Sequence, residues 1–148
     1  MIKSFRGTIQ DGDQKRIKLS TNQGLIGYKI KKLQILPYMP GFTKNLEVAF
    51  QIFTVERTAA IPTSGGTIDF DDPTLLGAAF YVSDTSHANA SSLDVIFDNV
   101  KFNQDIYVTM TDNEGADSMI NYYIELEQVK LDLNEATVAT LKDMRGRE

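Results

Sequence analysis

The stretches QDIYVTMT (residues 104–111) and MINYYIELEQVKL (residues 119–131) decide the fold class. In both stretches an apolar side chain recurs at every second position, which is the period of a β-strand with one face in the core. The alternating positions are Ile106, Val108 and Met110 in the first stretch and Tyr122, Ile124 and Leu126 in the second. Because turn-forming residues separate the two stretches, the sequence predicts that they pair as an antiparallel hairpin.

Short runs of the same kind, separated by clusters of Gly, Pro, Asn and Asp, continue through most of the chain. Residues 47–56 are apolar on both faces, which predicts a central strand or one covered on both sides. In residues 25–36 the apolar phase slips by one position at Lys31 and Lys32, which predicts a β-bulge. Pro37 is expected to end that strand. Counting gives about eight strands, so we predict an all-β, jelly-roll-like antiparallel β-sandwich.

Turn and loop signals lie between these runs. Residues 10–13 predict a tight turn and therefore an opening hairpin. Residues 58–66 lack periodicity and predict an exposed loop that serves as an arm or contact surface, followed by a brief strand around Ile68 and Phe70. Residues 75–82 are compatible with a strand or a helical turn, and the aromatic and β-branched residues at their end favour the strand.

The C-terminal residues have a helical pattern instead. Asn134 is a good N-cap, and Leu133 and Val138 occupy the two positions of a hydrophobic staple. We expect a short helix over residues 133–145, packed on the sandwich or on a neighbouring subunit. Residues 1–148 are then expected to form a single β-sandwich domain that includes this helix.

Composition narrows the classes of function. The formal net charge of −5 disfavours binding to nucleic acid and to anionic membranes. The absence of cysteine excludes disulfides, thiolate metal sites and a cysteine nucleophile. Neither a secretory signal nor an apolar stretch of the roughly eighteen residues needed for a membrane span is present, so we expect a soluble protein made in the cytoplasm.

The chain offers few groups for catalysis. His87 is the single histidine, and it has no Cys, no second His and no nucleophile elbow to act with. Gly65 and Gly66 lack the Gly-Lys-Ser/Thr ending of a phosphate-binding loop. An ordinary exposed histidine and an ordinary loop are therefore the favoured interpretations.

Acidic residues form the remaining candidate sites. Two loop clusters contain several carboxylates, namely Asp69, Asp71 and Asp72 in one and Asp112, Glu114 and Asp117 in the other. Neither has the spacing of a calcium-binding EF-hand loop, and we expect these side chains to cap backbone groups in turns. Glu125 and Glu127 share one strand face and form a weak candidate for a glycosidase-type pair.

Exposed aromatic side chains are a further candidate feature. Most aromatic residues fall at core positions, but Tyr38 and Phe42 lie in a loop rich in Pro and Gly. Aromatic rings on a surface can stack on sugars or pack against proteins. These two residues are the best candidates for exposed contacts.

Several segments resemble small virion-associated proteins of marine tailed bacteriophages. They are residues 102–109, 121–127 and 140–145, together with 27–30. The resemblance covers the second half of the chain better than the first and includes no catalytic signature. It implies a β-sandwich attached to the capsid or another part of the particle, present in many copies and assembled in the host cytoplasm.

The expected function is therefore structural. We predict a capsid decoration or cement subunit that binds the major capsid protein or other virion proteins and forms a cyclic homo-oligomer such as a trimer. No enzyme activity, catalytic residue, cofactor or metal is predicted, and no nucleic-acid or membrane partner. The alternative is a carbohydrate- or receptor-binding module of a tail fibre or spike. A small enzyme, the third class, would depend on His87 or on the acidic loops.

Overall fold

The computed structural model describes residues 1–19, 25–39, 45–84, 89–97, 100–114 and 118–132. Within these ranges the chain forms eight strands and no helix, which confirms the all-β prediction. The strands are β1 (Ile2–Gln10), β2 (Gln14–Ile17), β3 (Ile26–Pro37), β4 (Leu46–Phe53), β5 (Leu75–Asp84), β6 (Asn89–Ile96), β7 (Ile106–Asp112) and β8 (Met119–Lys130). The helix predicted for residues 133–145 lies outside the described residues. Nothing in the described ranges forms a helix of the length and apolarity that a membrane span requires.

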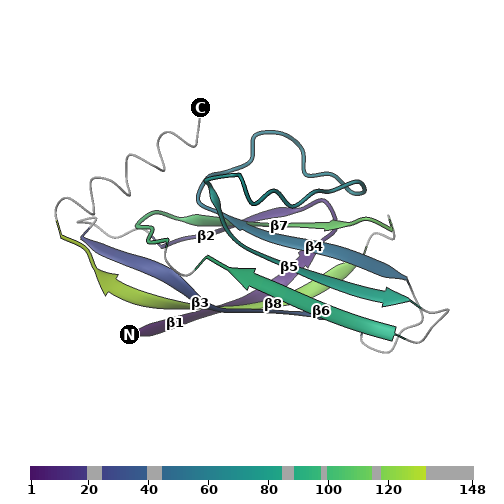
Figure 1. Ribbon diagram of the computed structural model, residues 1–148, viewed down its shortest axis with the longest axis horizontal. Helices are drawn as coiled ribbons and strands as arrows, with labels where there is room; N and C mark the ends of the chain where they lie inside the picture. Colours follow the sequence, from purple (N-terminus) through teal and green to yellow (C-terminus); the bar gives the residue numbers. More distant parts are fainter. Residues whose placement is uncertain (20–24, 40–44, 85–88, 98–99, 115–117, 133–148) are drawn as a thin grey trace.

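The strands form two antiparallel sheets that pack face to face (Figure 1). The small sheet has three strands in the order β1-β8-β3, and the large sheet has five in the order β2-β7-β4-β5-β6. Between them lies one apolar core, in which the Phe50 ring of the large sheet stacks on the Tyr122 ring of the small sheet at 5.5 Å. The predicted β-sandwich is therefore confirmed.

The strand order is that of a jelly roll, with one departure. In an eight-stranded jelly roll, strands 1, 8, 3 and 6 form one sheet and strands 2, 7, 4 and 5 form the other. Here β6 does not cross to the small sheet but stays hydrogen-bonded to β5. The small sheet consequently ends at β3, without its fourth strand.

The two predicted hairpins are wrong, because β1 and β8 belong to the small sheet while β2 and β7 belong to the large one. The turn after β1 forms as expected, with Gly12 at a φ of 85°, but it carries the chain from one sheet to the other. The connection from β7 to β8 also runs between the two sheets, and it is hydrogen-bonded to the connection from β1 to β2. The Asp11 N–H donates to the Ser118 carbonyl at 2.9 Å, and the Asp112 N–H donates to the Asp11 carboxylate at 2.8 Å.

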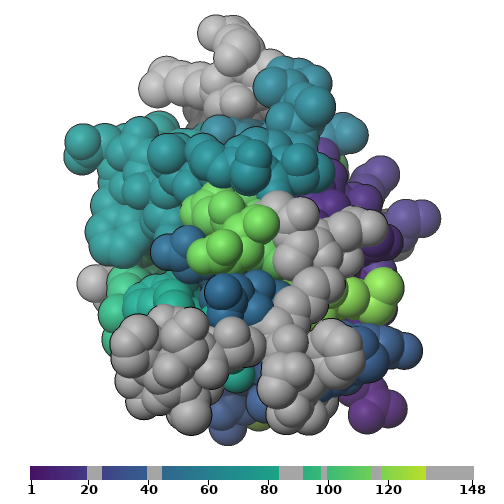
Figure 2. Space-filling model, turned by 90° about the vertical axis from the view of Figure 1, so that its right-hand side faces the viewer, coloured from purple at the N-terminus to yellow at the C-terminus, as the bar shows by residue number. Residues whose placement is uncertain are grey.

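Residues 54–74 form a loop that lies on the outer face of the large sheet, above β4 and β7 in Figure 1 and as the teal upper surface in Figure 2. It is held there by hydrogen bonds, among them Thr111 Oγ1 to the Pro62 carbonyl at 2.8 Å and Gln51 Nε2 to the Thr67 carbonyl at 3.0 Å. The exposed loop predicted for residues 58–66 is therefore present, but it lies against the sheet, and the strand predicted around Ile68 and Phe70 is not formed. This cover explains why both faces of β7 are buried.

Strand β3 has the features that the sequence predicted. Its register against β8 shifts between Ile30 and Lys32, so Lys31 is the extra residue of a β-bulge. The strand ends at Pro37. The predicted strand at 75–82 is also present, as β5.

Candidate functional site

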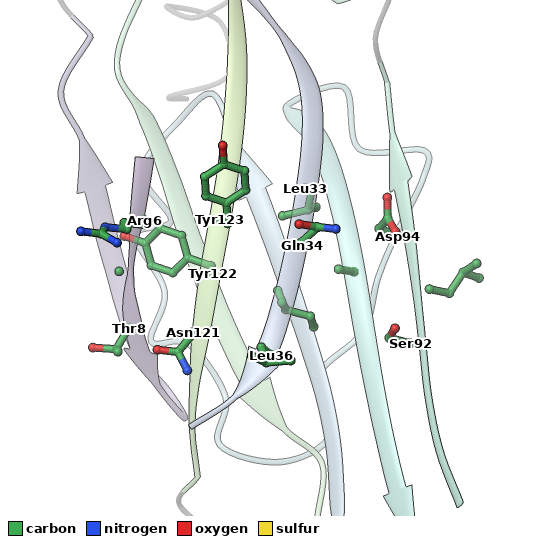
Figure 3. Close-up of a pocket in the computed structure, with 14 residues that line it drawn as sticks. Arg6, Thr8, Leu33, Gln34, Leu36, Ser92, Asp94, Asn121, Tyr122 and Tyr123 are labelled. Atoms are coloured by element: carbon green, nitrogen blue, oxygen red, sulfur yellow. The ribbon is translucent and has the colours of Figure 1, made fainter. Parts of the chain in front are cut away.

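An open cleft of about 660 Å³ lies on the surface of the described residues. It extends from β1 across β8 and β3 to β6 (Figure 3). Arg6 and Tyr123 lie on the β1 and β8 side, and Leu33 and Gln34 on β3. Asp94 of β6 lies on the opposite side of the cleft from β3.

On the β6 side the cleft is lined by residues 92–94 of that strand. Asp94 is in register with Ala79, and Ala79 is in register with the core residue Phe50. Side chains in register point to the same face of a sheet. Asp94, and Ser92 two residues before it, therefore belong to the core-facing side of the large sheet, yet both are exposed.

The backbone of β3 presents unpaired groups to this cleft. At one end of the β3-β8 ladder the Leu131 N–H donates to the Leu25 carbonyl at 2.8 Å, and at the other the Tyr38 N–H donates to the Met119 carbonyl at 3.2 Å. The odd-numbered residues of β8 are thus the ones that bond to β3. Their partners past the bulge are Lys32, Gln34 and Leu36.

The residues of β3 that alternate with these three point their backbone N–H and C=O groups away from β8. These residues are Leu33, Ile35 and Pro37, which are in register with even-numbered residues of β8. Proline has no N–H and is tolerated at an edge where that group would face outward, and Pro37 occupies such a position. The free edge of β3 therefore offers the N–H and C=O groups of Leu33 and Ile35, and no described strand pairs with them.

Two large apolar side chains of the cleft lining are exposed, among polar ones such as Gln34 and Asn121. Leu36 at the end of β3 is 59% exposed, and Leu93 of β6 is 58% exposed. Tyr38, directly after β3, is 57% exposed, as the sequence predicted, and Met39 follows it on the surface. Phe42 lies outside the described residues. Large exposed apolar side chains gathered at a concave surface are typical of sites that bind a partner.

Two tyrosines on β8 line the cleft as neutral hydrogen-bonding groups. Burial raises the pKa of Tyr122, whose hydroxyl lies over Gly7, a residue without a side chain. The hydrogen bond that the Tyr123 hydroxyl donates to Glu125 at 2.7 Å raises the pKa of Tyr123 as well. Both hydroxyls stay protonated at neutral pH and can donate hydrogen bonds, but neither is a nucleophile there.

The acidic cluster at 69–72 stabilises its own loop. The Asp69 carboxylate accepts a hydrogen bond from the Asp71 N–H at 2.9 Å, and Asp72 accepts from the Thr74 N–H at 2.8 Å. Burial by itself raises the pKa of Asp72, but the hydrogen bonds from Thr74 and the charge of Arg57 outweigh it and hold the pKa below its usual value. Nowhere in the described part of the chain do three or more acidic or histidine side chains gather as metal ligands do.

Asp112 has a structural role of the same kind. It is fully buried, and its carboxylate accepts hydrogen bonds from the Glu47 N–H at 3.2 Å, the Glu114 N–H at 3.1 Å and the Ser118 hydroxyl at 2.7 Å. Asp117, the third member of the predicted cluster, lies outside the described residues. The described part of this cluster joins β4, β7 and β8 rather than forming an open ligand site.

Glu125 and Glu127 lie on the same face of β8, as predicted, but each interacts with a different side chain. Glu127 pairs with Lys29 at 3.8 Å and Lys31 at 3.4 Å, whereas Glu125 accepts its hydrogen bond from Tyr123. The Gly66 N–H donates to the Asn113 side chain at 2.7 Å, which anchors that loop to the turn after β7. His87 lies outside the described residues.

Sequence reasoning did not find the cleft itself. Its floor and walls combine residues from β1, β3, β6 and β8, and no local pattern links these strands. One signal was present, since Ser92 and Asp94 are polar at alternate positions of a run that otherwise predicts a strand. An acidic residue on the core-facing side of an edge strand indicates that this side is not covered.

Comparison with known proteins gives no family for this chain. No known family model matches it, and no curated protein is detectably similar to it. The likeness to phage virion proteins therefore stays a prediction from the sequence.

Proposed function

We propose that the chain is a structural subunit of a phage virion, namely a capsid decoration or cement protein that acts by binding other virion proteins. One observation supports this best: an open cleft with exposed apolar side chains at Leu36 and Leu93 lies beside a strand edge with unpaired backbone groups. Proteins bind one another through such surfaces. Jelly rolls are also common in viral shells, which is support by analogy of fold alone.

The partner under this proposal is the major capsid protein or another protein of the particle, bound at many equivalent positions. A symmetric shell presents the same surface repeatedly, so the subunit is expected to act as a cyclic homo-oligomer, with a trimer as the simplest case. Assembly takes place in the host cytoplasm, and the mature location is the virion. The proposal includes no catalytic step.

Fractionation of infected cells tests this proposal. Antibodies against the purified chain are used to follow it through a caesium chloride density gradient of the phage lysate. We expect the chain in the band of intact particles, and cryo-electron microscopy of that band should place its density on the shell. If the chain stays at the top of the gradient, free of particles, the virion proposal is refuted.

The exposed ring of Tyr38 favours one alternative, a carbohydrate- or receptor-binding module of a tail fibre or spike. An exposed ring two residues after Leu36 of the cleft, whose lining includes the polar residues Asn121 and Arg6, is compatible with sugar stacking and hydrogen bonding. A glycan array separates the two functions. Binding of a defined glycan that is lost in Tyr38→Ala would favour the alternative.

A further inference from the structure

We propose that the cleft beside β3 binds an extended peptide segment of another virion protein, which adds to the small sheet as a fourth strand and places a basic side chain opposite Asp94. This inference rests on the proposed function and deepens it, because it names the kind of partner that the same cleft would hold. Four properties of the described residues support it: the unpaired edge, the pairing of β6 with β5 instead of β3, the charge of β6 and the limits of the edge.

The unpaired edge supplies the main-chain contacts. Leu33 and Ile35 direct two N–H and two C=O groups away from β8, toward the cleft. A peptide in β-conformation pairs with such groups whatever its sequence, and its side chains then add specificity. The side chains of Leu33 and Ile35 face the core, so pairing at these residues leaves the packing of β3 unchanged.

The sixth strand is not hydrogen-bonded to β3. In a complete jelly roll the sixth strand would lie next to the third, but here β6 is fully paired with β5 from Gly77 to Asp84. The space between β3 and β6 forms part of the cleft of about 660 Å³. The free edge from Lys32 to Leu36 is about 16 Å long at the usual rise per residue, which suits a short strand.

The negative charge of Asp94 on β6 favours a peptide with a basic side chain. Asp94 lines the cleft, and none of the described residues forms an ion pair with it. An inserted strand alternates its side chains, so one that points toward the large sheet meets Asp94 and Ser92. A Lys or Arg at that position gains a charge partner, whereas an acidic residue is repelled.

The ends of the edge restrict the partner to a short segment. The bulge at Lys31 breaks the ladder on one side, and Pro37, which has no N–H, blocks it on the other. Bulges, lysines and prolines are the devices by which proteins prevent uncontrolled pairing of edge strands. The part of β3 left open between them is a limited site rather than a general aggregation surface.

A tethered peptide tests the proposal without knowledge of the natural partner. Because the chain contains no cysteine, Ser92→Cys introduces a unique thiol at the cleft. The probe is the capped peptide Cys-Gly-Gly-Thr-Val-Lys-Val-Thr-Val, attached by a disulfide so that its effective concentration reaches the millimolar range. The readout is the hydrogen exchange rate of the Leu33 and Ile35 amides, measured by NMR.

We expect the tethered peptide to slow exchange of both amides at least ten-fold. The matched control is the same peptide with every backbone nitrogen of its strand methylated, which keeps the side chains and carbonyls but places methyl groups where they prevent the close approach of a strand ladder. No protection by the first peptide, or equal protection by both, overturns the proposal. A peptide with Glu in place of Lys should protect at least three-fold less, and equal protection by the two would overturn the assignment of a basic partner.

Particle binding separates this inference from the proposed function. Ile35→Pro removes the outward N–H, and Ile35→Ala shortens the side chain but keeps that N–H. If strand addition holds the subunit on the shell, Ile35→Pro should bind purified particles at least ten-fold more weakly than Ile35→Ala. Equal binding by the two variants contradicts strand addition while leaving the virion function intact, whereas failure of the unmodified chain to bind particles contradicts the function itself.

Discussion

Two proline substitutions in neighbouring residues of β3 should differ in cost, because their N–H groups point to opposite edges of the strand. Gln34 is in register with Tyr123 and bonds to β8, whereas Ile35 faces the free edge. Gln34→Pro loses one ladder hydrogen bond, worth about 1 kcal/mol, and leaves the Tyr123 carbonyl without its donor, which costs a further ~1–3 kcal/mol. We expect a total loss of about 3 kcal/mol in the free energy of unfolding.

Ile35→Pro keeps the ladder intact. It shortens a half-buried side chain, at about 1 kcal/mol, and recovers part of this because proline restricts the unfolded chain by ~0.4–1 kcal/mol. The difference of about 2 kcal/mol between the two variants corresponds to about 1 M in the urea midpoint at a typical slope. Urea unfolding followed by circular dichroism measures it, with Ile35→Ala as the side-chain control. Equal midpoints for the two proline variants would refute the assignment of the free edge.

Three further substitutions test other parts of the structure. Asp112→Ala removes a fully buried carboxylate that accepts three hydrogen bonds, one of them from the buried Ser118 hydroxyl, and should lower the free energy of unfolding by about 3–5 kcal/mol; a loss under about 1 kcal/mol in urea titrations would contradict this role. Because the pKa of Asp72 is lowered in the folded chain, its stabilisation is present above the ordinary carboxyl pKa and is lost as pH falls through the lowered value. When the pH is lowered below about 4, the melting temperature of Asp72→Asn should therefore fall less than that of the unmodified chain. An equal fall in both proteins would contradict the role of Arg57. Gly7→Ala would place Cβ 2.8 Å from the Tyr122 hydroxyl, so it should destabilise the fold by about 1 kcal/mol and shift the ring resonances of Tyr122; an unchanged NMR spectrum would argue against that contact.

Local features of the fold were predictable because they depend on neighbouring residues. The alternation in residues 119–131 gives β8 its buried and outer faces, and the phase slip at Lys31 gives the bulge. The two apolar faces of residues 47–56 predicted a central strand, and β4 lies between β7 and β5. Each of these patterns is fixed by the side-chain period of a strand.

The alternation of apolar residues did not predict which strands pair with each other. Alternation says which face of a strand is buried, but it does not say which strand lies beside it, so both predicted hairpins failed although the strands themselves are correct. Thr109 and Thr111 alternate with the core residues of β7 and lie on its outer face, yet the 54–74 loop buries them. Long-range contacts of this kind leave no local signal.

The candidate site was the least predictable part. The cleft combines residues from β1, β3, β6 and β8, and no short motif links these strands. Asp94 was the one residue whose position carried information, because an acidic side chain is unfavourable on a covered core face. The residues first considered for chemistry, Asp72 and Asp112, instead stabilise turns.

Native-state hydrogen exchange of the isolated protein tests the free edge of β3 most directly. The amides of Gln34 and Leu36 bond to β8, so they should exchange slowly, while those of Leu33 and Ile35 should exchange at least a hundred-fold faster. Such alternation along one strand arises only where a single edge is hydrogen-bonded. Uniformly slow exchange at all four amides would mean that another part of the chain already pairs with this edge, and it would contradict the account.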